Sequence, residues 1–396
     1  MARSGSPLGS LAALVAVLVV AMTGFGVFLP IFPFLALSTG ASATAVTWAL
    51  GAYSLGQFLT APLWGRLSDR VGRKPVLLIG LLGSVASYLL LSRAETILEM
   101  GGARLLGGLM AGNVGAAFAA AADLADDRTR ARNMGLLGAA VGFGFIAGPA
   151  LGAFLIGPSP DRAGFARICE VAAMFATAAA LVALLFFRET RRAADAPAER
   201  ARAWSLLRAQ PRLRGFVLIA LTMMSAQALM EASFGLWARA AFDWGPHQVG
   251  WALAAMGLGA ALLQGGGAGA ATKRFGDAGA LRGGLAAFAA GLLFLAAARN
   301  VAAASVALGF VTLGVALATP ALQSLVAKSA SEDARGAALG LNQSASALGR
   351  VLGPALAGLL FDTLGPAAPF ACGAALLFCA FLLSAARPPA LQPSSR

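Results

Sequence analysis

The chain has 396 residues, of which 59% are hydrophobic and only 12% are charged, and its formal net charge is +13. A soluble domain usually carries about 25% charged residues. A soluble fold of this length cannot bury so much apolar surface, so the composition excludes a soluble enzyme. It predicts a protein whose outer face is covered by a lipid bilayer.

The positive charge is distributed unevenly along the chain. Most of the 30 Lys and Arg residues fall in the N-terminus, in alternate turns and in the C-terminal tail. This pattern follows the positive-inside rule and predicts that both termini lie in the cytoplasm. It argues against a nucleic-acid partner, which a basic protein could otherwise suggest. Three Cys and one His show no metal-ligand spacing, so we expect no metal and no cofactor.

Twelve apolar runs are long enough to cross the bilayer as helices, which takes roughly 20 mainly apolar residues. They do not alternate polar and apolar residues as barrel strands do. We therefore predict an all-α integral membrane fold. The predicted spans are 9–33, 45–63, 76–93, 98–121, 133–156, 164–187, 213–238, 247–270, 280–298, 301–325, 336–361 and 370–386.

The two halves of the chain resemble each other. Residues 48–50, 72 and 148–151 recur as 251–253, 276 and 353–356, at offsets of 203 to 205. We predict two pseudo-symmetric six-helix bundles, a transporter architecture with its substrate site between the halves. The predicted parts are an N-terminal bundle (1–187), a cytoplasmic linker (188–212) and a C-terminal bundle with a short cytoplasmic tail (213–396).

A charged turn follows the second predicted span, at residues 65–75. It matches the loop signature of the major facilitator superfamily, and the whole chain resembles the bacterial drug:proton antiporters of that superfamily. The resemblance implies that the loop aspartate is a latch that stabilises the outward-open state at the start of the eleventh span, near Arg335. The alternative is that these charges only set the topology. The latch residues would be Gly65, Asp69, Arg70, Gly72, Arg73 and Lys74, with Asp123 as an acidic partner.

The fourth and fifth spans carry two further family-like motifs. One face of the fifth span carries Gly144, Gly148 and Gly152, and Pro149 in the same span would kink the helix. This segment resembles the antiporter signature of exporters. Ordinary small-residue packing is the alternative. Arg104 lies inside the fourth span, where a charge costs about 2.5–3.5 kcal/mol. The resemblance implies a part in proton transfer, and the alternative is a structural arginine held by backbone carbonyls.

Glu231 lies well inside the seventh span, on one face with Gln227 and Phe234. A carboxyl group in a low-dielectric site can exchange a proton near neutral pH, so we predict that Glu231 couples transport to protons. Similar efflux pumps carry a glutamate at this point. The alternative is a structural acid in a permanent salt bridge.

The substrate-binding residues are predicted from polar or aromatic side chains within spans. Arg350 either pairs with Glu231 or binds an anionic group of the substrate. The tetracycline exporters that the chain resembles carry acids where this chain has Ala21 and Ser87, so metal–tetracycline is not the expected cargo. The predicted set is Phe25, Phe28, Asn113, Gln227, Glu231, Phe234, Asn342 and Arg350.

Together these features predict a secondary transporter that exports a small amphipathic or lipophilic compound in exchange for protons. No ATP-binding motif is present, which argues against a primary pump, and we expect the proton as the coupling ion. We expect a monomer in the bacterial cytoplasmic (inner) membrane. Two alternatives stay open: a facilitator or proton-coupled transporter of an anionic metabolite, sugar or siderophore, and a non-transporting membrane sensor or scaffold.

Overall fold

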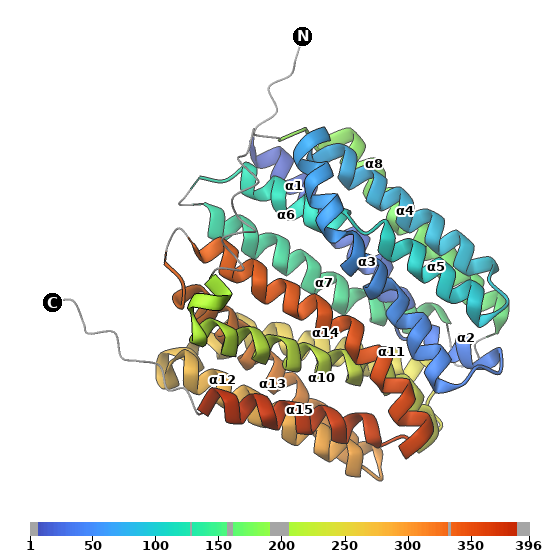
Figure 1. Cartoon of the computed structure of the whole chain (residues 1–396). Helices are drawn as coiled ribbons and strands as arrows, with labels where there is room; N and C mark the ends of the chain where they lie inside the picture. Colours follow the sequence, from blue (N-terminus) through green and yellow to red (C-terminus); the bar gives the residue numbers. More distant parts are fainter. Residues whose placement is uncertain (1–6, 127–128, 157–160, 191–205, 332–333, 386–396) are drawn as a thin grey trace. The chain divides into compact units, whose positions relative to one another are not determined.

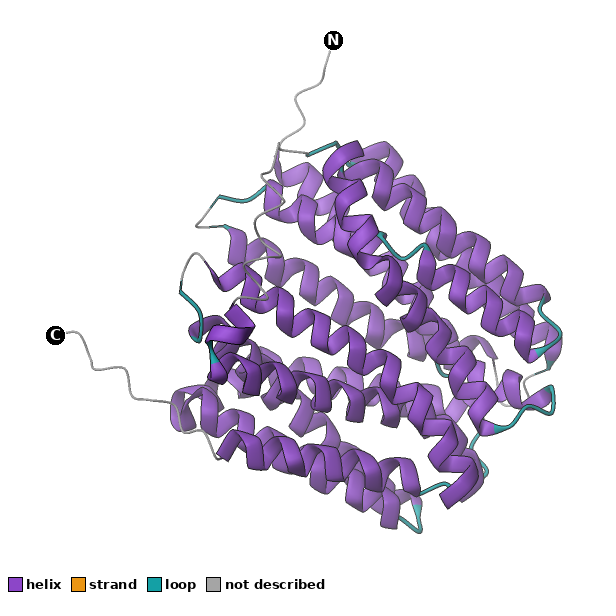
Figure 2. Ribbon diagram, in the orientation of Figure 1, coloured by secondary structure: helices purple, strands orange, loops and turns teal. Residues whose placement is uncertain are grey.

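The computed structural model describes residues 7–126, 129–156, 161–190, 206–331 and 334–385. Every regular element in these ranges is a helix (Figure 2). Each of the twelve predicted spans is helical, and eleven segments of the described residues are long and apolar enough to cross a membrane. The second predicted span, 45–63, lies in the helix Ala43–Val71, which is not among the eleven. Residues 191–205 of the predicted linker and the tail from residue 386 lie outside the described ranges.

The chain divides into two compact units. The first comprises Met1–Ala196 and Phe234–Gly257, and the second comprises Pro197–Ser233 and Leu258–Arg396. The division passes through α10 (Pro211–Phe242) and α11 (Pro246–Leu262). The helical, two-bundle fold class is confirmed, whereas the predicted boundaries of the bundles, on either side of the linker 188–212, stay a prediction.

In the first unit, α1 packs on α7 and α8, α3 packs on α5, and α4 packs on α8 (Figure 1). Its apolar core is made mainly of Leu, Val and Ala from α1, α4, α6, α7 and α8. The helices are α1 (Pro7–Phe28), α2 (Phe32–Ser38), α3 (Ala43–Val71), α4 (Arg73–Arg93), α5 (Ile97–Leu109), α6 (Asn113–Asp123), α7 (Arg130–Ile156) and α8 (Arg162–Phe186).

In the second unit, α12 packs on α13 and α15, and α14 contacts both α13 and α15. A π-helical turn, η1 (Leu263–Gly267), joins α11 to α12. The remaining helices are α12 (Ala268–Ala297), α13 (Val301–Lys328), α14 (Arg335–Leu364) and α15 (Ala368–Ala385).

The fourth span, predicted as one helix, is interrupted between α5 and α6. α5 ends at Leu109 and α6 begins at Asn113, without a side-chain cap at Gly112. The indole nitrogen of Trp64 donates to the Leu109 carbonyl at 2.7 Å and so ties α3 to the end of α5. Interrupted helices in transporters expose backbone groups at mid-membrane, where ligands bind.

The related halves contain an ion pair of opposite polarity at equivalent places. Arg73 follows Gly72 and bonds to Asp123, the last residue of α6, at 2.9 Å. Asp277 follows Gly276 and bonds to Lys328, the last residue of α13, at 2.5 Å. Both glycines have positive φ angles, 107° and 71°. The buried residue of the ion pair is the cation Arg73 in the first half and the anion Asp277 in the second.

This inversion predicts that the second pair tolerates exchange of its charges. Lys328→Glu is expected to destabilise the protein by about 1 kcal/mol, because it places a second acid beside the buried Asp277. The double variant Asp277→Arg/Lys328→Asp is expected to recover most of that loss. Thermal unfolding in detergent checks this, with Lys273→Glu, on the same helix as Asp277, as control. A double variant less stable than Lys328→Glu would contradict the equivalence.

Candidate functional site

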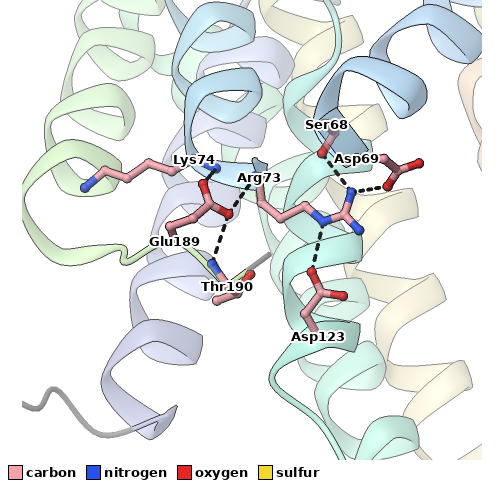
Figure 3. Close-up of polar contacts among 7 residues, drawn as sticks. All are labelled: Ser68, Asp69, Arg73, Lys74, Asp123, Glu189 and Thr190. Carbon is pink, nitrogen blue, oxygen red and sulfur yellow. Dashed lines mark hydrogen bonds and ion pairs between the residues drawn. The ribbon is translucent and has the colours of Figure 1, made fainter. Parts of the chain in front are cut away.

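The predicted loop, residues 65–75, consists of the end of α3 and the start of α4 with only Gly72 between them, and it holds a network of charges inside the first unit (Figure 3). The Arg73 side chain is only 8% exposed and donates to the Asp69 carboxylate at 2.6 Å and to Asp123 at 2.9 Å. It also donates to the Ser68 hydroxyl at 3.0 Å. Arg73 therefore joins α3, α4 and α6, and the predicted partner Asp123 does contact the loop.

An acid that was not predicted from the sequence completes this network. Glu189 lies just after α8, and its carboxylate accepts hydrogen bonds from the backbone N–H groups of Arg73 at 2.8 Å and Lys74 at 3.1 Å (Figure 3). These amides open α4 and have no partner within the helix, so the carboxylate caps its positive end. Only glycine suits position 72, because a Cβ atom there would collide with the Glu189 carboxylate. The φ angle of Gly72 is also +107°, which other residues rarely adopt.

The other loop residues are held less firmly. The Lys74 ammonium donates to the Leu184 carbonyl at 2.8 Å, which links the loop to α8. Arg70 is exposed, and a Cβ atom on Gly65 would meet nothing within 4 Å. Of the predicted latch residues, Arg73 thus has the tightest contacts, and Asp69 meets it in the same unit.

The glycines of the fifth span pack α7 closely against α1. A Cβ atom on Gly148 would lie 2.5 Å from the Gly26 Cα and 2.7 Å from the Thr23 carbonyl oxygen, so the two backbones touch. Gly144 and Gly152 meet α1 in the same way. On its other side, the Pro149 carbonyl lies against Gly250 of α11. The motif makes close helix packing possible.

Gly148→Val is expected to force α1 and α7 apart and to destabilise the protein by about 3 kcal/mol, at the upper end of the cost of overpacking. Gly142→Val on the same helix is the control, because a Cβ atom there meets nothing within 4 Å. The check is the folded fraction after detergent extraction and heating. Equal stability of the two variants would contradict the packing.

Arg104 lies in an aromatic chamber of the first unit. Its side chain is 3% exposed, and its guanidinium carbon lies 4.7 Å from the ring centre of Tyr53, 5.3 Å from that of Phe28 and 5.5 Å from that of Phe25. The chamber is also lined by Ser84, Ser87, Tyr88 and Asn113. Three predicted residues, Arg104, Phe25 and Asn113, therefore meet at one cavity, whereas its tyrosines and serines were missed.

Glu231 and Gln227 interact in the second unit. The Gln227 amide donates to the Glu231 carboxylate at 2.9 Å, one helical turn away on α10. Glu231 is exposed, and the charge of Arg350 on α14 acts on its carboxylate. The structure therefore joins Gln227 and Glu231 directly, and Arg350 acts on Glu231 only through its charge.

Two predicted binding residues lie in different surroundings. Phe234 is 1% exposed and packs on Trp237, with ring centres 6.0 Å apart, so its ring is enclosed by protein. Asn342 on α14 is also buried, and its side-chain oxygen accepts no hydrogen bond from the described residues. Asn342 thus keeps an unused acceptor, whereas Phe234 belongs to the packing of α10.

A larger cavity of about 380 Å³ lies elsewhere in the first unit. Its walls combine aromatic side chains with two Arg and two Asp residues. Asp243 there has a positive φ of 53°, which is uncommon for a residue other than glycine. This cavity was not predicted, because it forms where the ends of helices and short connections that are far apart in the chain come together. Its charged residues are Asp161, Arg162, Arg239 and Asp243.

A helical membrane fold with internal repeats and charges kept within its spans defines a membrane transporter rather than an enzyme. The family model of the Major Facilitator Superfamily matches residues 14–240 and 232–396. The chain belongs to this superfamily.

Named relatives point to drug transport within the superfamily. The chain is 30% identical over 341 residues to the class C tetracycline resistance protein of Escherichia coli, covering 84% of each. It is 28% identical over 347 residues to Multidrug resistance protein 1 of Bacillus subtilis (strain 168), covering 87% of this chain and 88% of that protein. The crystal structure of the human organic anion transporter MFSD10 (TETRAN) matches with a TM-score of 0.72 at 24% identity, covering 96% of this chain and all of that one.

Proposed function

We propose that the protein exports a small amphipathic compound from the cytoplasm in exchange for protons, by alternating access. The observation that carries this proposal is the Gln227–Glu231 pair within α10, where a membrane span keeps an acid and a hydrogen-bonded amide on one face. An ionisable side chain inside a span is costly and marks a transport or proton pathway. The names of the tetracycline and multidrug resistance relatives support a drug-like cargo.

In the proposed cycle, ionised Glu231 favours cargo binding from the cytoplasm. After cargo release outside, a proton neutralises Glu231 and the empty carrier returns, while Asp69 acts as the latch of the outward-open state. Arg104 contributes through its fixed positive charge, because a guanidinium keeps its proton at every accessible pH. The protein works in the bacterial inner membrane, as a monomer with both termini in the cytoplasm.

The free energy released when one proton enters the cell is comparable to the free energy needed to export one molecule of cargo. One charge moving through 100 mV yields about 2.3 kcal/mol. A hundredfold gradient of a neutral cargo costs about 2.7 kcal/mol. One proton, driven by a modest potential together with a pH difference, therefore suffices.

Transport by purified protein in liposomes tests the proposal. With a pH gradient imposed, a fluorescent amphipathic compound is expected to accumulate against its concentration gradient, and collapse of the pH gradient should release it. Counterflow without a gradient controls for binding and leak. Flux that ignores the pH gradient would mean a facilitator, and the absence of flux for a panel of dyes, antibiotics and organic acids would mean a sensor or scaffold.

A further inference from the structure

The Arg104 guanidinium is a buried cation that has no anionic partner among the described residues. Its side chain is 3% exposed, and it makes no hydrogen bond or ion pair with any residue in the part of the chain that the structure describes. Its Nε in particular is enclosed and unpaired. A buried charge is strongly unfavourable unless something compensates it.

The aromatic rings around Arg104 compensate only part of this cost. Tyr53, Phe28 and Phe25 place ring centres 4.7 to 5.5 Å from the guanidinium carbon, the range of cation–π attraction. Rings interact with the face of a guanidinium, whereas its five N–H groups point outward in its plane. Those N–H groups form the fork that binds a carboxylate through two parallel hydrogen bonds.

A second feature makes the same chamber favourable for negative charge. α6 begins at Asn113, which lines the chamber, and no side chain caps this helix start. The first amides of a helix point toward its N-terminal end and carry a partial positive charge. Asn113 therefore brings the start of α6 to the wall of the chamber that also holds the guanidinium.

The free space of the chamber sets the size of its occupant. It measures about 20 Å³, which is room for a group of about one water molecule. The Ser87 hydroxyl donates to the Ala103 carbonyl at 2.7 Å, and no hydrogen bond joins it to the Arg104 guanidinium. A drug-sized body cannot enter, but a single small anionic group can.

We propose that this chamber binds one small monovalent anion on Arg104, either the carboxylate group of a transported compound or a free halide. In the first case the inference rests on the proposed function and narrows its cargo to compounds with a carboxylate. In the second, the anion is a bound ion that neutralises Arg104.

Thermal unfolding of the full chain in detergent tests the proposal without any pH gradient, so its outcome is independent of proton-coupled export. The protein is kept in sodium HEPES, and sodium acetate, sodium chloride or neutral acetamide is added at increasing concentration. A ligand that binds only the folded state raises the unfolding temperature in a saturable way. We expect this rise with acetate or chloride and not with acetamide.

Variants test whether the rise in unfolding temperature depends on Arg104. Arg104→Gln is expected to lose it, whereas the control Arg93→Gln, at the exposed end of α4, keeps it. Ser87→Asp places a carboxylate in the chamber and is expected to abolish the response, which keeps the test decisive if Arg104→Gln does not fold. A response to acetate without one to chloride would assign the anion to the carboxylate of a cargo, and a response to chloride alone would assign it to the free ion. An equal effect of acetamide, no response in the natural protein, or a response that survives in Arg104→Gln or Ser87→Asp would overturn the proposal.

Discussion

Glu231→Gln is expected to abolish proton-driven export while leaving exchange of cargo intact. Glutamine has nearly the same shape as glutamate and can still bond to Gln227, whose amide lies 2.9 Å from the Glu231 carboxylate. It cannot gain or lose a proton, so the cycle loses its only proposed proton-binding step. In inside-out membrane vesicles, uptake of a dye driven by acidification of the lumen should fall to the level of vesicles without the protein.

Counterflow and a second acid make this result specific. Counterflow of labelled against unlabelled cargo needs no net proton movement, so the Glu231→Gln variant should retain it. Glu170→Gln, which removes an exposed acid of α8, should leave both activities unchanged. Undiminished uptake by the Glu231→Gln variant in response to the pH gradient would refute the coupling role.

Arg73→Met is expected to be the most destabilising change in the loop. The arginine is 8% exposed and bonds to both Asp69 and Asp123, so its loss leaves two acids close together without a cation. Breaking a buried ion pair by removing one partner costs about 3 kcal/mol. We therefore expect a lower unfolding temperature and a loss of transport.

A double variant and a neighbouring arginine control this prediction. Arg73→Met/Asp123→Asn removes one of the two stranded charges and should be more stable than Arg73→Met alone. Arg70→Met changes an exposed arginine of the same loop and should unfold like the natural protein. If Arg70→Met and Arg73→Met unfold at the same temperature, the network in Figure 3 does not stabilise the fold.

The helices were predictable because composition and length alone require them in a bilayer, where every backbone polar group must be bonded internally. The acidic partner of Arg73 was also predictable, since a buried arginine needs an acid and few acids are available. Breaks within helices were less visible: the interruption before Asn113 follows no proline, and the sequence shows one continuous apolar run there.

Contacts between helices were harder to predict than the helices themselves. Tyr53 and Ser87 meet Arg104 because of the rotation of α3 and α4 about their own axes, which a single sequence does not reveal. Glu189 was overlooked because it follows α8 in a basic segment that resembles a plain linker. The pair of Asp277 and Lys328 was missed because its charges are reversed relative to the first half, so that a comparison by identity finds no match.

Release of protons when cargo binds is the most direct test of the central claim, that the protonation of Glu231 is linked to cargo binding. Purified protein in weakly buffered detergent solution is mixed with each member of a panel of dyes, antibiotics and organic acids, while a pH indicator records the change. The proposed cycle predicts that a transported compound acidifies the solution with the natural protein and not with Glu231→Gln. Equal acidification with both proteins would contradict it.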